Sequence, residues 1–93
     1  PIFGVMDHVI DWVIAQGVPA DAATTYVTNM FAAVCQEACG MDKEGVHHMA
    51  TVSTPGGINM QALELLDAAG AFTAWQQTLD PIMVRTSFGI FKG

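Results

Sequence analysis

The chain has 93 residues, of which 52% are hydrophobic and only 13% are charged, and its formal net charge is −6. A chain of this length forms one domain at most, and it carries more apolar surface than a small monomer can bury, so we expect a single domain over residues 1–93 that associates with other protein. The three basic residues offer no footprint for nucleic acid or for an anionic membrane surface, and no apolar run reaches the roughly 18 residues that a spanning helix needs.

Residues 2–16 are expected to form a helix that is apolar around most of its circumference. Only Asp7, His8 and Asp11 mark a narrow polar stripe. A helix of this kind is buried, and here we expect it to be buried against a partner chain. Gly17 is expected to end this helix in the left-handed conformation, and Pro19 then opens the next one.

Residues 20–39 predict a second helix, which Gly40 ends. Its apolar residues recur at three- and four-residue steps, at Ala23, Val27, Met30, Phe31, Val34, Cys35 and Ala38. A weaker pattern over residues 42–52 predicts a short third helix, with Asp42 as its N-cap.

A fourth helix is expected over residues 58–69 and a fifth segment after it. The fourth helix is closed by Gly70, and the residues expected to face inward are Ile58, Ala62, Leu65, Leu66 and Ala69. In the fifth segment Pro81 lacks a backbone donor, so we expect a kink, or a restart with Asp80 as cap and a piece from 81 to about 88. No alternating strand pattern occurs in the sequence, and the predicted fold class is therefore all-α with about five helices.

The stretch from Val52 to Asn59, with the sequence Val-Ser-Thr-Pro-Gly-Gly-Ile-Asn, joins the third and fourth helices. A Gly-Gly turn that leads into a helix leaves several backbone N–H groups pointing one way, at the positive end of the helix dipole. Such a turn can bind a phosphate or a carboxylate, and the side chains of Ser53, Thr54 and Asn59 can add hydrogen bonds. The other interpretation is an ordinary joint between two helices with a polar cap, and the residues alone favour it.

The remaining polar and sulfur-containing residues indicate no further chemistry. Cys35 and Cys39 lie four apart in a helical pattern, which is poor disulfide geometry, so we expect reduced core cysteines and a cytoplasmic setting. The adjacent His47 and His48 would diverge on a helix, and no metal site is expected. Because His8 has no nucleophile at a recognisable spacing and the sequence lacks Gly-x-Ser-x-Gly and Gly-x-Gly-x-x-Gly, we assign no catalytic residue and no dinucleotide site.

Several segments, taken in order, resemble the pyrroline-5-carboxylate reductase family. The Val-Ser-Thr-Pro-Gly-Gly block at 52–57, the helix that begins at Met60 with the pair Ala62-Leu63, and the later Gly70-Ala71-Phe72 are similar to that family's signature. Upstream, Gln16-Gly17-Val18-Pro19 resembles the Gly-Leu-Pro joint between the first two helices of the family's C-terminal domain. The resemblance spans about residues 1–85.

The resemblance implies an all-α dimerisation domain, similar to the C-terminal domain of 6-phosphogluconate dehydrogenase, that forms a homodimer or a higher oligomer. In the intact enzyme, NADPH or NADH, bound mainly by an N-terminal domain absent from this chain, would reduce 1-pyrroline-5-carboxylate to L-proline. The substrate carboxylate would meet the hydroxyl of Thr54 beside Ser53 and the backbone N–H groups of Gly56, Gly57 and Ile58. Asn59 would stand where the family has threonine.

Three departures from the family pattern bear on the function. Asn59 replaces a threonine, which leaves a related cyclic imine or another small carboxylate open as the substrate. Pro81 lies in a last helix that usually runs unbroken in the family. Without a nucleotide domain, hydride transfer is not expected from these 93 residues alone, and we expect a fragment of a reductase. The alternative is a stand-alone helical association module without catalysis.

Overall fold

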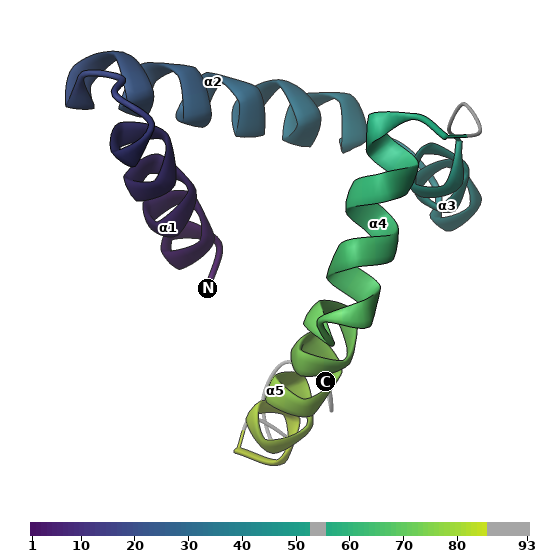
Figure 1. The fold of residues 1–93 in the computed structure, drawn as a ribbon. Coiled ribbons are helices and arrows are strands. Elements are labelled where there is room, and N and C mark those ends of the chain that lie inside the picture. The colour runs from purple at the N-terminus through teal and green to yellow at the C-terminus, as the bar shows by residue number, and fades with distance from the viewer. Residues whose placement is uncertain (53–55, 86–93) are drawn as a thin grey trace. The chain divides into compact units, whose positions relative to one another are not determined.

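The computed structural model describes residues 1–52 and 56–85, and all regular secondary structure in this part of the chain is α-helical (Figure 1). The helices in chain order are α1 (Ile2–Ala15), α2 (Ala20–Ala38), α3 (Lys43–Thr51), α4 (Ile58–Ala68) and α5 (Ala71–Arg85). The predicted all-α class with five helices is confirmed. The chain divides into two compact units, Pro1–Ala50 and Thr51–Gly93, with the boundary at the end of α3. The single domain over residues 1–93 stays a prediction.

In the first unit, a tight turn joins α1 to α2. Gly17 has a φ of 101°, which side-chain-bearing residues rarely adopt, and its N–H donates to the carbonyl of Ile14 at 2.9 Å. Pro19 then caps the start of α2 and accepts the first helical hydrogen bond, from the N–H of Ala23 at 2.9 Å. Both the predicted left-handed end of the first helix and the predicted start of the second are confirmed.

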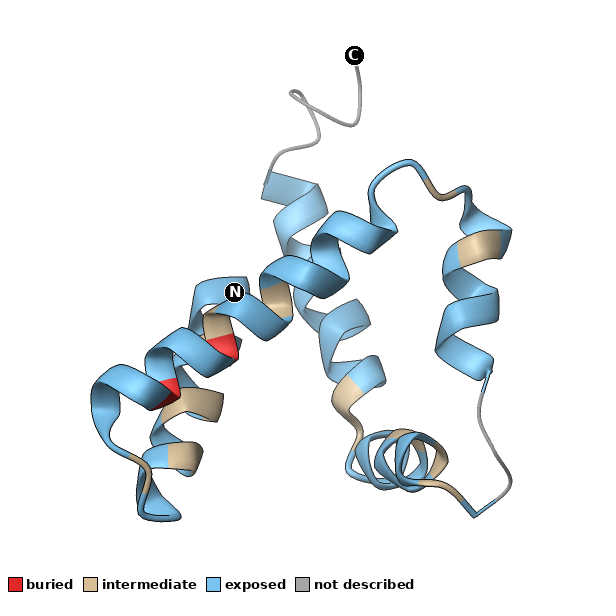
Figure 2. Cartoon of the chain, turned by 90° about the horizontal axis from the view of Figure 1, so that it is seen from above, coloured by how far each residue is buried: buried red, intermediate tan, exposed pale blue. Residues whose placement is uncertain are grey.

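The small core of this unit lies where α1 contacts α2. Ala23 and Val27, in the first half of α2, are the only buried residues among those described (Figure 2). On α1 the half-buried side chains recur at helical spacing, at Met6, Val9, Ile10 and Val13. This face of α1 therefore belongs to the contact with α2.

Most of the remaining apolar surface of α1 and α2 is exposed in the single chain. Trp12 of α1 is 63% exposed, and so is Val34 of α2. In the apolar stripe predicted for α2, Ala23 and Val27 are buried and Phe31 is half-buried, so the stripe faces inward in part. It is exposed at Met30, Val34, Cys35 and Ala38. Helices α1 and α2 separate with distance from their turn (Figure 1), so the end of α2 lies farther from α1 than its start does.

The short helix α3 begins with the predicted cap. The Oδ1 atom of Asp42 accepts a hydrogen bond from the N–H of Gly45 at 2.7 Å, and the carbonyl of Asp42 accepts the first helical bond, from Val46 at 3.1 Å. This is the usual N-cap arrangement, in which a side chain satisfies a donor that the helix itself leaves unused.

In the second unit, α4 contacts α5, and Gly70 joins them with a φ of 79°. The face of α4 that is half-buried contains Met60 and Leu63. The predicted inward set is wrong for the single chain, because Ile58, Ala62, Leu65, Leu66 and Ala69 are all exposed. Apolar residues occur around much of α4, and their spacing alone does not tell which of them α5 covers.

Helix α5 runs without interruption from Ala71 to Arg85 and contains Pro81. The restart with Asp80 as cap, one of the two predicted outcomes, is therefore wrong, whereas a kink within the continuous helix stays a prediction. Positions 86–88 of the predicted last piece lie outside the described residues. Proline removes one N–H and so leaves the carbonyl of Gln77 without its usual helical donor. Because α5 is exposed from Phe72 to Arg85, water can reach such a carbonyl, and the helix continues.

Candidate functional site

The candidate anion-binding turn leads into α4, and the structure describes its second half. Gly56 has a φ of 75°, and Gly57 follows in extended conformation, with φ −78° and ψ 169°, as the N-cap of α4. Ser53 and Thr54, two of the predicted site residues, lie outside the described residues. The other four, Gly56, Gly57, Ile58 and Asn59, are contiguous at the start of the helix.

The first turn of α4 has the features of an anion-binding helix end. The first N–H that the helix uses is that of Gln61, which donates to the carbonyl of Gly57 at 3.1 Å, so the preceding N–H groups are not used by the helix itself. Gly57 has no side chain, and within the described part of the chain no side chain caps this end. The first turn also contains no acidic residue, so an approaching carboxylate meets no like charge there.

The side chain of Asn59 makes a contact that the sequence does not predict. Its Nδ2 donates to the backbone carbonyl of Val52 at 3.2 Å, across a separation of seven residues. From the sequence, Asn59 is expected only to face a ligand. No local pattern indicates this bond, because it depends on the path of the turn between the two residues.

The other candidate residues do not converge on a second site. Cys35 and Cys39 are free and exposed, so the prediction of core cysteines is wrong for the single chain. No cluster of three or more potential metal ligands occurs among residues 1–52 and 56–85. The Nδ1–H of His8 donates to the carbonyl of Gly4, one turn earlier in α1, at 2.8 Å.

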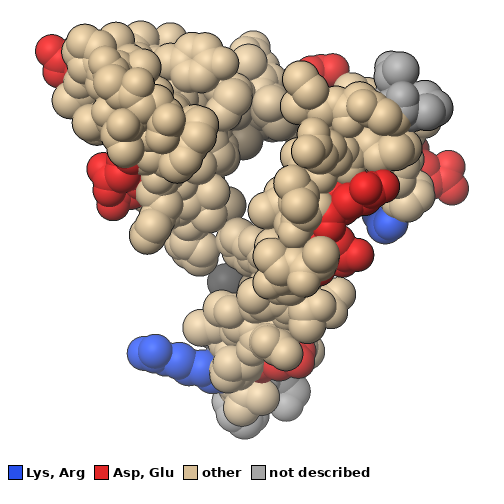
Figure 3. Space-filling view, in the orientation of Figure 1, with Lys and Arg blue, Asp and Glu red and all other residues tan. Residues whose placement is uncertain are grey.

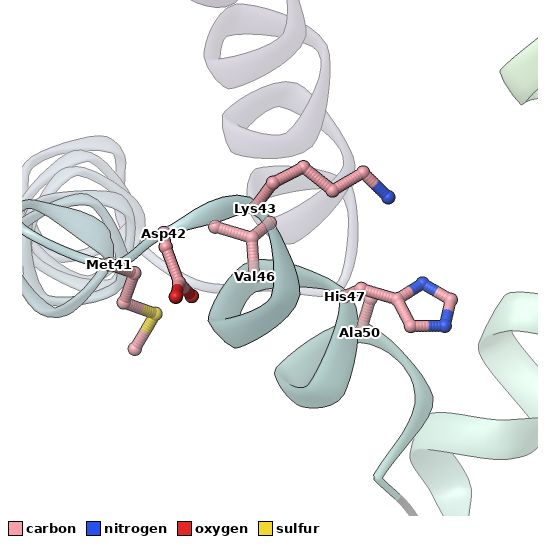
Figure 4. A pocket seen from close by; sticks show the side chains of 6 residues that line it. All are labelled: Met41, Asp42, Lys43, Val46, His47 and Ala50. Carbon is pink, nitrogen blue, oxygen red and sulfur yellow. The ribbon is translucent and has the colours of Figure 1, made fainter.

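A shallow hollow lies at the start of α3. Its lining comprises Met41, Asp42, Lys43, Val46, His47 and Ala50. Figure 4 shows that the side chains of Lys43 and His47 point away from the carboxylate of Asp42. Since the Asp42 carboxylate already caps α3, the hollow presents no converging set of polar groups.

The charged side chains form no patch on the face seen in Figure 3. Most of this surface is uncharged, and its acidic groups are isolated or in small neighbouring groups. The described residues include no helix that is both long and apolar enough to cross a membrane.

Comparison with models of protein families matches residues 2–87 to the family described as pyrroline-5-carboxylate reductase dimerisation. The match includes all five helices and the whole turn between α3 and α4. A search of the curated proteins and a search of the solved structures each found no significant match. Because the family model matches nearly the whole length of the chain, the chain belongs to the pyrroline-5-carboxylate reductase dimerisation family.

Proposed function

We propose that this chain joins two copies of a pyrroline-5-carboxylate reductase-like enzyme and supplies the turn that holds the carboxylate of its imine substrate. The observation that carries the first part is the small size of the core, since only Ala23 and Val27 are buried among the described residues. Large apolar side chains stay exposed on every helix, including Phe3 of α1 at 86%. A second copy that covers these faces would add the apolar burial that the single chain lacks.

The second part of the proposal concerns the first turn of α4. The N–H groups of Gly56, Gly57, Ile58 and Asn59, with the hydroxyls of Ser53 and Thr54, form the proposed carboxylate site. Support comes from the glycine N-cap and from the absence of acidic residues in the first turn of α4. Substrate binding here would orient the imine and neutralise its carboxylate, and it would transfer no proton.

The family's reductase reaction uses a pyridine nucleotide as hydride donor. A dinucleotide is usually held by a strand, a glycine-rich turn and a helix, and the described part of this chain is all-helical without such a unit. The residues present therefore do not fit the nucleotide, and we assign NADPH or NADH to another part of the intact enzyme. Reduction of the imine to L-proline belongs to that whole enzyme.

The carboxylate site is tested with L-proline, the product of the family's reaction, by titration of the ¹⁵N-labelled chain. L-Prolinamide is the matched control, because it has the same ring but no carboxylate. We expect L-proline to shift the backbone amide resonances of Gly56, Gly57, Ile58 and Asn59, and L-prolinamide to leave them in place. The direct N–H contacts to a charged acceptor are the physical reason.

Either of two results contradicts the site. If L-proline at tens of millimolar leaves these four amides unmoved, the turn is only a joint between helices and the chain is an association module. If L-prolinamide produces the same shifts as L-proline, the ring and not the carboxylate is being recognised.

A further inference from the structure

We propose that Asn59 is a positioning residue, which fixes the first turn of α4 through the hydrogen bond from its side chain to the carbonyl of Val52. The Nδ2···O distance is 3.2 Å. Val52 directly follows α3, and Asn59 is the second residue of α4. Both residues belong to the second unit, and the bond joins the residue before the turn to the start of α4.

The chemistry of the two groups determines which end of the amide is used. A backbone carbonyl only accepts hydrogen bonds, so the amide nitrogen of Asn59 must face Val52. The amide nitrogen carries two hydrogens, whereas a threonine hydroxyl carries one on a shorter side chain. Asparagine at this position therefore reaches Val52 and still has a second N–H on its amide nitrogen. By the resemblance, the family has a threonine at this position.

The bond matters for α4 because, within the described part of the chain, no side chain caps this helix end. The backbone N–H of Asn59 belongs to the same first turn as those of Ile58 and Met60. A side chain held against Val52 restrains the direction of all three. Its functional consequence rests on the proposed carboxylate site, where a turn ordered in advance loses less conformational freedom when a ligand binds. Asn59 then acts on the ligand through its backbone and not through its side chain.

The test compares Asn59→Val with Asn29→Val in the ligand-free chain. Valine and asparagine have similar helix propensities, so the replacement chiefly removes the amide. Asn29 is an exposed asparagine within α2 and is the matched control. The reporters are the exchange rate of the Gln61 N–H, which makes the first helical bond of α4, and the ¹³C′ resonance of Val52.

In Asn59→Val we expect the Gln61 N–H to exchange roughly two- to tenfold faster, as for the loss of one typical hydrogen bond. The Val52 carbonyl resonance should shift as well, and Asn29→Val should change neither. Asn59→Asp is the second variant, because it keeps the size of the side chain and replaces the donor with an acceptor. It should shift the Val52 resonance in the same way, and it decides the question if Asn59→Val does not fold.

The outcomes separate the positioning role from the proposed site. Unchanged Val52 and Gln61 signals in the ligand-free variants, with only L-proline binding weakened, would make Asn59 a direct ligand and overturn the positioning role. Changed signals in a chain whose wild-type form does not bind L-proline would uphold the positioning role while the carboxylate site fails.

Discussion

Single residues fix the helix ends of this chain by local chemistry. Asp42 shows this, because its carboxylate accepts the Gly45 N–H at 2.7 Å at the start of α3. The sequence predicts this cap because the donor and the acceptor lie only three residues apart. The contact between Asn59 and Val52 has the same chemistry, but seven residues separate its ends. Whether this hydrogen bond forms depends on the path of the intervening turn, so short-range sequence patterns do not predict it.

The cap of α3 is tested by Asp42→Ala. We expect the helix to lose about 1 kcal/mol, because the N–H of Gly45 loses its acceptor and the carboxylate near the positive helix end is removed. Amide exchange at Val46, whose N–H donates to the Asp42 carbonyl, measures the loss. Asp42→Asn is the control and should keep most of the protection, since asparagine caps about as well as aspartate. Equal protection in wild type and in Asp42→Ala would show that the cap contributes nothing to α3.

At the scale of the element, helix existence and helix faces differ in how far they can be predicted. Apolar periodicity predicts α1, α2 and α4 most clearly, and these helices end near glycines such as Gly17 and Gly70, whose positive φ ends a helix locally. The pattern of α3 is weaker, and the pattern of α5 does not predict that the helix continues past Pro81. The buried faces are harder to predict: the spacing of Leu65 in α4 predicts an inward position, and its side chain is exposed. Which apolar face is covered depends on the neighbouring helix and, in a dimerisation domain, on the second copy.

Pro81 shows how an element can override a local rule. A proline inside a helix is unfavourable by about 3 kcal/mol relative to alanine, yet α5 continues through it. This free-energy cost lowers the stability of α5 but does not have to end the helix.

We therefore expect Pro81→Ala to stabilise α5, by about 2 kcal/mol once the smaller entropy of a proline-containing unfolded chain is allowed for. The alanine restores the N–H that can donate to the Gln77 carbonyl. Slower amide exchange in the last two turns of α5, together with a higher Tm, is the expected measurement. Asp80→Ala, one residue earlier and without a change in backbone donors, is the control. Faster exchange in Pro81→Ala would mean that the proline geometry itself is needed by α5.

At the scale of the whole molecule, the composition anticipates association and the structure shows which surfaces remain for it. The chain is 52% hydrophobic, and the described residues bury only Ala23 and Val27. Trp12 of α1 and Val34 of α2 are each 63% exposed. The exposure of Trp12 agrees with the expectation for α1, which is that its own chain does not cover all of its apolar surface. The geometry of the assembled dimer requires the second copy and does not follow from one sequence.

The most direct test of the central claim is sedimentation equilibrium of the 93-residue chain at micromolar concentration. We predict a mass of twice the 9.9 kDa of one chain, or a multiple of that dimer, because the exposed apolar faces are covered by a second copy. A single species of 9.9 kDa that keeps its helical circular dichroism over the same concentrations would contradict the account, since a folded monomer would not need the dimer contact.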